Sequence, residues 1–481
     1  MLEADKYISE LIKKARAAQE IAETYDQKRV DRICETVAYA CVNPKFMRKA
    51  ADMLYEESEM GNPDDKFQKI RNKVLGVYSE MKDEKSVGII KEDREKQLVT
   101  YIKPMGVIGG IIPVTNGEST IIVKTLWALK SRNALIVSPH RRGKNTAAYI
   151  VSYIRKILGL LGEPQDLIQN ISPDQCGREA AAEMMKQCDF IVATGGNGLV
   201  KAAYSSGTPA IGVGAGNATV YIDESADLTD FAEKLKISQS FDNSSSCSSE
   251  NNLICHSKIY ENVIHAMENN KGFLIKEGSA EKERLIKTIW PNWPENDALG
   301  RRTPAKSAVD IAKMAGIEVP EDTVYLVIEE QKGYGRGVVT TGEKLCPVVS
   351  LLKADSFDTA RNMIKQILLY QGEGHSCGIF TKNESQIEAL AEKIHVCRIL
   401  VNQPQSMGNA GAYFNGMPST NSLGCGSWGG NSSSHNVTWR DLTNTTTVSR
   451  YIPEKKPLKE ENVFSGEFRS SDMAKKIDTF C

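Results

Sequence analysis

Long apolar runs are missing from this chain of 481 residues. No stretch approaches the roughly 18 apolar residues that a membrane-spanning helix needs. Charged residues interrupt the N-terminal segment from Glu3 onward, which does not fit a signal peptide. A charge excess is missing too, because the formal net charge is −1, and this argues against nucleic acid or an anionic membrane surface as the main partner. The sequence therefore predicts a soluble protein that binds neither nucleic acid nor membrane.

Paired cysteine spacing is also absent. The eleven cysteines form no CxxC pair, no zinc-ribbon pattern and no dense framework of the kind found in small secreted domains. No metal site is predicted, and reduced thiols in the cytoplasm are the simplest interpretation. A chain of 481 residues is too long for one compact core, so we expect two or three domains.

The sequence also lacks the usual dinucleotide-binding fingerprint, which is GxGxxG directly after a strand. Weak glycine clusters stand at 106–110 and 195–198, and most such clusters are only turns. The basic loop 138–144, Ser-Pro-His-Arg-Arg-Gly-Lys, is more informative because it follows the second predicted strand, where an NAD site would favour a carboxylate. Arginine there suits the extra phosphate of NADP, since a guanidinium pairs with two phosphate oxygens at once. Judged alone, a solvated basic turn is an equal alternative.

What the sequence does contain is a regular alternation of apolar strands and helices. Residues 6–60 have helical periodicity, and the alternation begins at Met105 and resumes after residue 247. Near-continuous apolar strands separated by helices predict parallel sheets covered on both faces, so the predicted fold class is α/β with two such domains. Two short strands at 87–90 and 98–102 predict a hairpin-like excursion, and the last 25 or so residues resemble a polar surface tail. The main strands are predicted at 107–112, 134–137, 167–171, 190–193, 253–255, 324–328, 348–352 and 399–401.

One cysteine stands apart from the other ten. Cys247 lies in a run of small hydroxyl and amide residues, between an amphipathic helix at 227–240 and the apolar run at 253–255. Free cysteines are usually packed in cores, but this thiol is expected on a tight polar turn. A cysteine is an intrinsically strong nucleophile, and backbone N–H groups at the start of a turn can lower its pKa. The pattern favours a catalytic thiol.

Five segments together resemble the aldehyde dehydrogenase superfamily, specifically its coenzyme-A-acylating branch. The resemblance covers roughly residues 7–450, and its segments are 113–116, 138–140, 212–217, 241–247 and 422–431. It implies two Rossmann-like domains and a small β element. The nucleotide-binding domain is expected at 1–230 and the catalytic domain at 231–415. Residues 416–452 would return to the nucleotide-binding domain and supply the oligomerisation strand, and 453–481 would form a polar tail. Strands within 95–104 and 439–451 would form the element through which a homodimer or homotetramer assembles.

The resemblance also implies roles for individual residues. Cys247 corresponds to the nucleophile, and Asn116 with the backbone N–H of Cys247 to the donors that hold the alkoxide. Glu343 corresponds to the residue that holds the nicotinamide ribose of NADP or NAD. The nicotinamide of this cofactor accepts the hydride. His375 assists deprotonation of a thiol or contacts the coenzyme A arm, with a structural imidazole as an equal alternative. The predicted cofactor site contains Pro113, Ser138, His140, Arg141, Arg142, Gly195, Gly214, Gly216 and Glu343.

The group that releases the acyl chain separates two hypotheses. Hydrolytic members of the superfamily carry a glutamate at the start of a Glu-Leu-Gly-Gly-Lys segment, whereas the matching stretch 211–217 has glycine at that position. Base catalysis contributes about 10² to 10⁴-fold, so water should attack slowly and the thiol of coenzyme A is favoured. The first alternative is a hydrolytic aldehyde dehydrogenase, and the second is a catalytically silent scaffold.

The aldehyde is predicted from the residues around Cys247. Ser245, Ser246 and Ser248, with Met407 from the segment 405–413, are expected to line the pocket. Hydroxyl groups donate hydrogen bonds to an acceptor-rich head group, so a short anionic aldehyde suits the pocket better than a long alkyl one. The serine-rich run looks most like that of acylating sulfoacetaldehyde dehydrogenases. Succinate semialdehyde and acetaldehyde are the alternatives.

Overall fold

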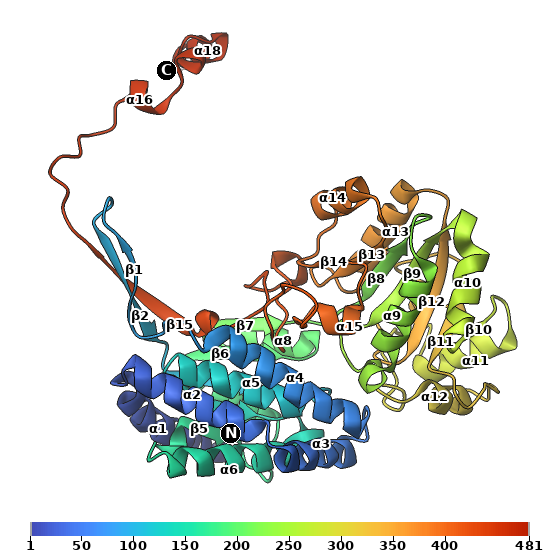
Figure 1. Cartoon of the computed structure of the whole chain (residues 1–481), viewed down its shortest axis with the longest axis horizontal. Coiled ribbons are helices and arrows are strands. Elements are labelled where there is room, and N and C mark those ends of the chain that lie inside the picture. The colour runs from blue at the N-terminus through green and yellow to red at the C-terminus, as the bar shows by residue number, and fades with distance from the viewer. Residues whose placement is uncertain (1, 480–481) are drawn as a thin grey trace. The chain divides into compact units, whose positions relative to one another are not determined.

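The chain folds into two compact units in the computed structural model, which describes residues 2–479. The first unit contains the residues up to 86 and 103–444, and the second contains 87–102 and the chain from 445 onward (Figure 1). None of the described helices is long and apolar enough to cross a membrane. Among the same residues, no cluster of three or more His, Cys, Asp or Glu side chains is arranged to hold a metal ion.

Four helices open the first unit: α1 (Leu2–Glu23), α2 (Gln27–Cys41), α3 (Pro44–Ser58) and α4 (Pro63–Met81). Two of them begin in the same way. The Asn43 and Asn62 side chains accept hydrogen bonds from the first free N–H groups of α3 and α4, and a proline follows each asparagine. Asparagine at the cap and proline in the first turn are both strong helix-start signals. The start of α4 matters for the site, as described below.

A five-stranded parallel sheet follows. It has the order β5-β4-β3-β6-β7, formed by β3 (Val107–Ile111), β4 (Ala134–Ser138), β5 (Ile168–Asn170), β6 (Phe190–Thr194) and β7 (Ala210–Val213). In chain order this is 3-2-1-4-5, the arrangement of dinucleotide-binding α/β domains. The connecting helices are α5 (Gly117–Lys130), α6 (Lys144–Leu160), α7 (Arg178–Gln187) and α8 (Asn197–Tyr204).

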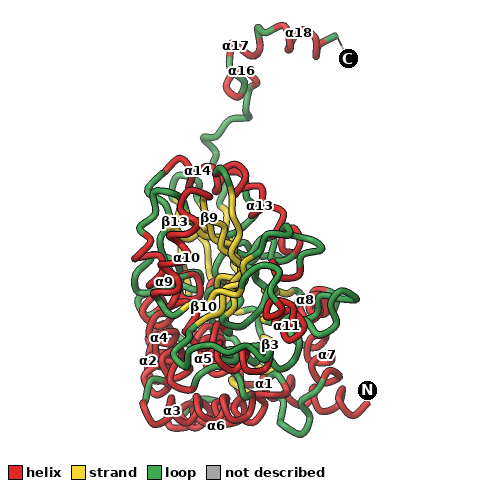
Figure 2. The backbone as a smooth tube through the Cα atoms, turned by 90° about the vertical axis from the view of Figure 1, so that its right-hand side faces the viewer, coloured by secondary structure: helices red, strands yellow, loops and turns green. Residues whose placement is uncertain are grey.

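The second sheet has seven parallel strands in the order β10-β11-β12-β9-β8-β13-β14. Figure 2, in which strands are yellow, shows α9 (Leu228–Ser240) and α10 (Tyr260–Asn269) on one side of it and α13 (Phe357–Tyr370) on the other. The strands are β8 (Ala218–Ile222), β9 (Glu250–His256), β10 (Gly272–Ile275), β11 (Tyr325–Glu329), β12 (Val348–Ala354), β13 (Cys377–Phe380) and β14 (Ile399–Val401), with further helices α11 (Ala280–Ile289), α12 (Ala308–Met314), α14 (Glu384–Lys393) and α15 (Gln405–Gly408).

Both faces of the seven-stranded sheet are buried, which explains why its strands are almost continuously apolar. Val220 and Leu253 belong to the hydrophobic core under α9 and α10, whereas their neighbours Tyr221 and Ile254 belong to the core under α13. Successive side chains of a strand point to opposite faces, so a doubly covered sheet needs apolar residues at every position. The predicted α/β class with parallel sheets is confirmed.

The chain crosses from the first sheet to the second at an earlier residue than the sequence predicted. The last strand of the first sheet ends at Val213, and β8 already pairs with β9 and β13 of the second sheet. The strand pairing therefore places the passage at 214–217, inside the glycine-rich segment, and not at the predicted boundary of residue 230. Strand β8 was not predicted, because nothing local in its sequence says which sheet it joins.

The second unit contains a small antiparallel sheet of the order β1-β2-β15. Its strands are β1 (Gly88–Asp93), β2 (Leu98–Pro104) and β15 (Thr443–Ser449). The predicted hairpin at 87–102 is present, with a bulge between Ile89 and Lys91. Up to residue 479, the tail carries the short helices α16 (Glu460–Val463), α17 (Gly466–Arg469) and α18 (Asp472–Asp478).

Candidate active site

Cys247 follows a turn with an uncommon backbone. Helix α9 ends at Ser240, and the next residues include Asp242, Asn243 and Ser244, with φ angles of 50°, 51° and 51°. Positive φ is unfavourable for residues with a Cβ atom, although asparagine and aspartate tolerate it better than most. Three such residues in succession persist only where surrounding contacts hold them.

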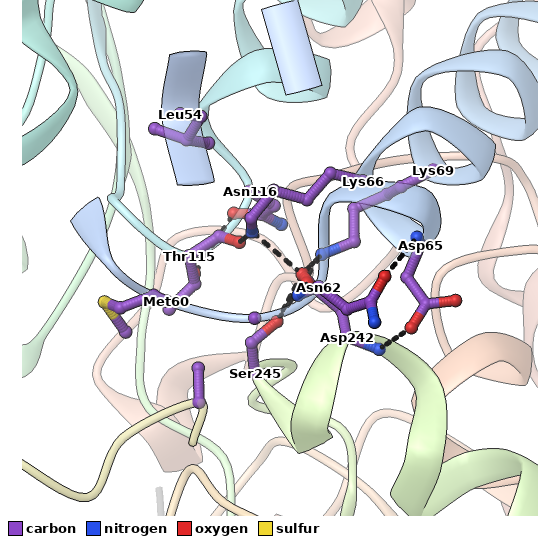
Figure 3. A network of polar contacts seen from close by, with 12 residues as sticks. Leu54, Met60, Asn62, Asp65, Lys66, Lys69, Thr115, Asn116, Asp242 and Ser245 are labelled. Atoms are coloured by element: carbon purple, nitrogen blue, oxygen red, sulfur yellow. Dashed lines mark hydrogen bonds and ion pairs between the residues drawn. The ribbon is translucent and has the colours of Figure 1, made fainter. Parts of the chain in front are cut away.

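The contacts that hold this turn come from α4 (Figure 3). The carboxylate of Asp242 accepts hydrogen bonds from Lys66 Nζ at 3.1 Å, from Lys69 Nζ and from the backbone N–H of Asn62 at 2.8 Å. Its side chain is only 1% exposed. Burial opposes its ionisation, but the ammonium groups of Lys69 and Lys66 outweigh that effect and keep the pKa of the Asp242 carboxyl below its usual value. The buried ion cluster of Asp242, Lys66 and Lys69 thus holds the turn against α4.

The same cluster reaches toward the thiol. Ser245 Oγ donates to the Asp242 carboxylate at 2.8 Å, and the Asp242 backbone N–H donates to the carboxylate of Asp65 at 2.9 Å. Residues 242 and 245 are therefore both tied to α4. Cys247 is two residues further along, and we infer that the cluster sets its position.

The thiol of Cys247 pairs with an imidazole. Its Sγ lies 3.4 Å from His375 Nε2, and His375 Nδ1 lies 2.9 Å from Ser376 Oγ. Burial, followed by the positive charge of Arg398, lowers the pKa of His375 to about 3. Burial, followed by the carboxyl of Glu343, raises the pKa of Cys247 to about 12. At neutral pH the pair is therefore a thiol beside a neutral imidazole, and in the tautomer that carries its proton on Nδ1 the Nε2 atom accepts a hydrogen bond from the thiol.

Arg398 anchors the loop that carries His375. The guanidinium is buried, and its Nη2 donates to the carbonyl oxygens of His375 at 2.9 Å and Gly424 at 2.7 Å. It therefore joins the loop 372–376 to the glycine-rich segment 422–431, which are far apart in the sequence. The resemblance alone gave no sign of this connection.

A first cavity has a volume of about 370 Å³. Its lining includes Gly214, Gly216 and Glu343, and the backbone N–H of Gly216 donates to Glu343 Oε1 at 3.2 Å. A Cβ atom at Gly216 would lie 2.0 Å from the carbonyl oxygen of Cys247 and 3.1 Å from His375 Cδ2. Only glycine fits there. Burial raises the pKa of Glu343 to about 8.

A second cavity, of about 700 Å³, is lined by four of the residues predicted around the aldehyde: Asn116, Ser245, Ser246 and Met407. Ser248 is fully buried and is not part of this lining. Ser246, the residue before Cys247, lines the second cavity, and the backbone carbonyl of Cys247 packs against Gly216, which lines the first.

Two hydrogen-bond donors are available, the side-chain amide of Asn116 in the lining of the second cavity and the backbone N–H of Cys247. Asn116 precedes α5 but makes no capping hydrogen bond with its side chain, whose oxygen accepts from Thr115 Oγ1 at 3.3 Å. Within residues 2–479, neither the Asn116 amide nitrogen nor the backbone N–H of Cys247 donates to another group of the chain. Free donors beside a nucleophile suit an oxygen that becomes negatively charged.

The remaining predicted cofactor residues lie at the carboxyl edge of the five-stranded sheet. Pro113 follows β3, Ser138 ends β4, and Gly195 follows β6 directly. Open parallel sheets bind their ligands at this edge. A dinucleotide fits the observed features, which are a glycine-lined cavity, a buried carboxyl group and this strand edge.

The basic loop after β4 is less free than the sequence indicates. Arg142 donates from its guanidinium to the carbonyl of Ser58 in α3, and its backbone N–H donates to His140 Nδ1 at 3.0 Å. The side chains of His140 and Arg141 are exposed. Partial desolvation, with the charges of Arg142 and Arg141, lowers the pKa of His140, which indicates a positive local potential. Arg141 is the arginine of this loop that remains available to an anion.

The glycine at the position of the hydrolytic glutamate is also explained by packing. A Cβ atom at Gly212 would lie 2.5 Å from Val200 Cγ1 and 2.9 Å from Tyr204 Cε2 in α8. The Tyr204 hydroxyl also accepts a hydrogen bond from the Gly212 backbone N–H at 2.8 Å. A glutamate at this position would have to displace the side chains of Val200 and Tyr204, so the base of the hydrolytic members does not fit this packing.

Several residues of the site were not predicted. Lys66, Lys69 and Lys73 project from one face of α4, and the first two are buried. A signal for them exists in the sequence, because they recur at helical spacing with the buried apolar residues Ile70 and Val74. Lysines on the apolar stripe of an amphipathic helix are unusual and point to buried partners.

Comparison with known proteins agrees with this arrangement. The model of the aldehyde dehydrogenase family matches residues 3–281. A sulfoacetaldehyde dehydrogenase from Acholeplasma sp. is 41% identical over 451 residues, which cover 94% of this chain and 92% of the relative. A succinate-semialdehyde dehydrogenase (acetylating) from Clostridium kluyveri is 37% identical over 95% of this chain and 98% of the relative.

A solved structure extends the likeness to the whole fold. The acetylating aldehyde dehydrogenase from Geobacillus thermoglucosidasius superposes with a TM-score of 0.90 at 35% sequence identity, covering 95% of this chain and 99% of that one. The family model, the near full-length relatives and the fold agree with one another. The chain belongs to the aldehyde dehydrogenase family, in its acylating branch.

Proposed function

We propose that the protein oxidises a short aldehyde to its acyl-coenzyme A with NADP⁺ or NAD⁺, through a thioester on Cys247. The observation that carries this proposal is the thiol–imidazole pair, 3.4 Å between Sγ and Nε2, whose neighbours Ser246 and Gly216 line two separate cavities. One cavity suits the aldehyde and the other the nicotinamide cofactor and, after it, coenzyme A. The absence of space for a carboxylate at Gly212 supports a thiol and not water as the acyl acceptor.

The residues divide the chemistry among them. His375 Nε2 takes the proton from Cys247 as Sγ attacks the aldehyde carbon, and the neutral imidazole at pH 7 is the form that this step requires. The amide of Asn116 and the backbone N–H of Cys247 hold the resulting oxyanion. The nicotinamide cofactor, when bound, accepts the hydride, and Glu343 is placed to orient its ribose. The thiol of coenzyme A then displaces Cys247 from the thioester.

The relatives support an anionic aldehyde, with sulfoacetaldehyde proposed first. The names of two near full-length relatives specify sulfoacetaldehyde and succinate semialdehyde, both short and anionic at neutral pH. The hydroxyl groups of Ser245 and Ser246 in the second cavity agree with an acceptor-rich head group. Arg141 at the carboxyl end of β4 supports NADP⁺ over NAD⁺. The free strand edges of the small sheet support assembly into a homodimer or homotetramer.

The test is cofactor reduction by the purified protein with an aldehyde panel, with and without coenzyme A. Reduction of NADP⁺ or NAD⁺ that requires coenzyme A is expected, with sulfoacetaldehyde as the best substrate. Cys247→Ala should abolish it with the fold unchanged, and turnover in that variant would remove the thiol from the mechanism. Equal rates without coenzyme A would mean hydrolysis, and Glu343→Gln would then show whether the Glu343 carboxyl activates the water.

A further inference from the structure

Lys73 is a cation on the wall of the second cavity that the mechanism does not use. It lies on α4 and lines this cavity together with Lys69. Its Nζ donates to two backbone carbonyl oxygens, of Ala410 at 2.5 Å and Gly411 at 3.1 Å. A lysine ammonium has three N–H donors, so one donor of Lys73 remains available to a ligand in the cavity.

The charge of Lys73 is not balanced by a neighbour. Lys66 and Lys69 share the carboxylate of Asp242, but no carboxylate of residues 2–479 lies within 4.0 Å of Lys73 Nζ. Glu80, which is further along α4, accepts the Ser419 backbone N–H with both of its oxygens, at 2.9 and 3.0 Å. Burial, only partly offset by Glu80, lowers the pKa of Lys73 to about 7. An anion in the cavity would restore the charge balance and keep the ammonium protonated.

The position of Lys73 along α4 matches a short molecule. Lys69 Nζ lies 3.5 Å from Ser245 Oγ, two residues before the reactive thiol. Lys73 is one turn further along the same face, a rise of about 6 Å for four residues. Lys73 and Ser246, the residue before Cys247, line the same cavity, so a two- to four-carbon aldehyde bound at Cys247 with its other end in this cavity has its head group in the space that Lys73 lines.

We infer that Lys73 is the residue that selects anionic aldehydes, by receiving their sulfonate or carboxylate head group while the loop carbonyls of Ala410 and Gly411 hold its ammonium in place. This inference rests on the proposed function and specifies the substrate class of the same site. Lys69 is less suited to the role, because Asp242 already neutralises it. Lys73 and residues of the loop 405–413 thus form part of the wall of this cavity.

The first test compares substrates in the Lys73→Met variant. For sulfoacetaldehyde and succinate semialdehyde, kcat/KM should fall about 10- to 100-fold, the cost of one charge-assisted hydrogen bond, mainly through KM. For the neutral aldehydes propanal and butanal it should change by no more than about twofold, because they make no such bond. The anion with the larger loss identifies the head group. Lys73→Arg should retain most of the preference for anions.

Arg71→Met is the matched control. Arg71 lies on the exposed side of the same helix, so this change removes one positive charge from α4 without altering the cavity. It should leave all four substrates unaffected. Equal losses for anionic and neutral aldehydes in Lys73→Met would mean that Lys73 only supports the loop 405–413, and the inference would be overturned. Unchanged anion preference would overturn it as well.

A binding measurement keeps this inference separate from the proposed function. Ethanesulfonate should protect Cys247 from alkylation by iodoacetamide in the unaltered protein and in Arg71→Met, but not in Lys73→Met; butanol should protect none of them. Protection that depends on Lys73 would support the anion site even if no aldehyde gave coenzyme-A-dependent turnover. Turnover with coenzyme A, but without any effect of Lys73 on protection or specificity, would refute the anion site alone.

Discussion

Replacing Asp242 by asparagine tests whether the buried ion cluster holds the catalytic turn. Asn keeps the size of the side chain but removes the charge that Lys66 and Lys69 share, and these two lysine side chains are 0% and 10% exposed. Removing one partner of a buried ion pair costs about 3–5 kcal/mol, because the remaining charge is left uncompensated. The three left-handed residues that Asp242 stabilises should then relax, and activity should fall together with stability.

Glu118 limits the size of the effect. This buried carboxyl group has no hydrogen-bond partner among the described residues, and it interacts electrostatically with Lys66 and Lys69. Burial raises its pKa, and the two lysines counteract this. With Asp242 gone, Glu118 supplies part of the lost negative charge. We therefore expect a decrease in the free energy of unfolding near the lower limit, about 3 kcal/mol.

Urea-induced unfolding, followed by tryptophan fluorescence, measures this change. Glu224→Gln is the control, because it removes the acidic partner of an exposed pair with Lys258, 2.8 Å apart, and should cost less than about 1 kcal/mol. Adding Lys69→Met to Asp242→Asn should recover part of the loss, since one of the unpaired charges is then removed. If Asp242→Asn costs no more than the control, the cluster does not stabilise the turn as described.

Three further predictions concern the thiol and the cofactor. Gly216→Ala should reduce dehydrogenase activity by at least about 100-fold with an unchanged circular dichroism spectrum, because the alanine Cβ would lie 2.0 Å from the Cys247 carbonyl oxygen. Normal activity in this variant would show that the segment around residue 216 moves aside easily. The rate of Cys247 alkylation should rise about tenfold per pH unit from pH 7 to 10, since the thiolate reacts and the thiol pKa is raised to about 12; a plateau below pH 9 would reveal a stabilised thiolate. Arg141→Ser should raise KM for NADP⁺ about tenfold or more and leave KM for NAD⁺ unchanged, whereas equal effects would mean that Arg141 does not contact the 2′-phosphate.

Much of the fold could be predicted from local patterns. The strands β3, β4, β6, β11 and β12 coincide with short apolar runs between helices, because a doubly covered parallel strand must be apolar on both faces. Strand β8 is equally apolar, but its place in the second sheet depends on pairing with β13, more than 150 residues away. Local sequence carries no information about such a partner.

The candidate site divides in the same way. The sequence by itself determined that a cysteine lies on a polar turn among serines, because this is a property of residue type and order, and the family resemblance added that glycine replaces the hydrolytic glutamate. Only the tertiary structure decided the state of the thiol and of the lysines near it. The pKa of Cys247 depends on burial and on the carboxyl of Glu343, and both Glu343 and the imidazole that contacts the thiol, His375, come from distant segments. By residue type alone, Lys73 would be assigned to the surface. Only the packing of α4 against the loop 405–413 turns its side chain toward the cavity. The reason is that burial and charge are set by neighbours in space and not by neighbours in the chain.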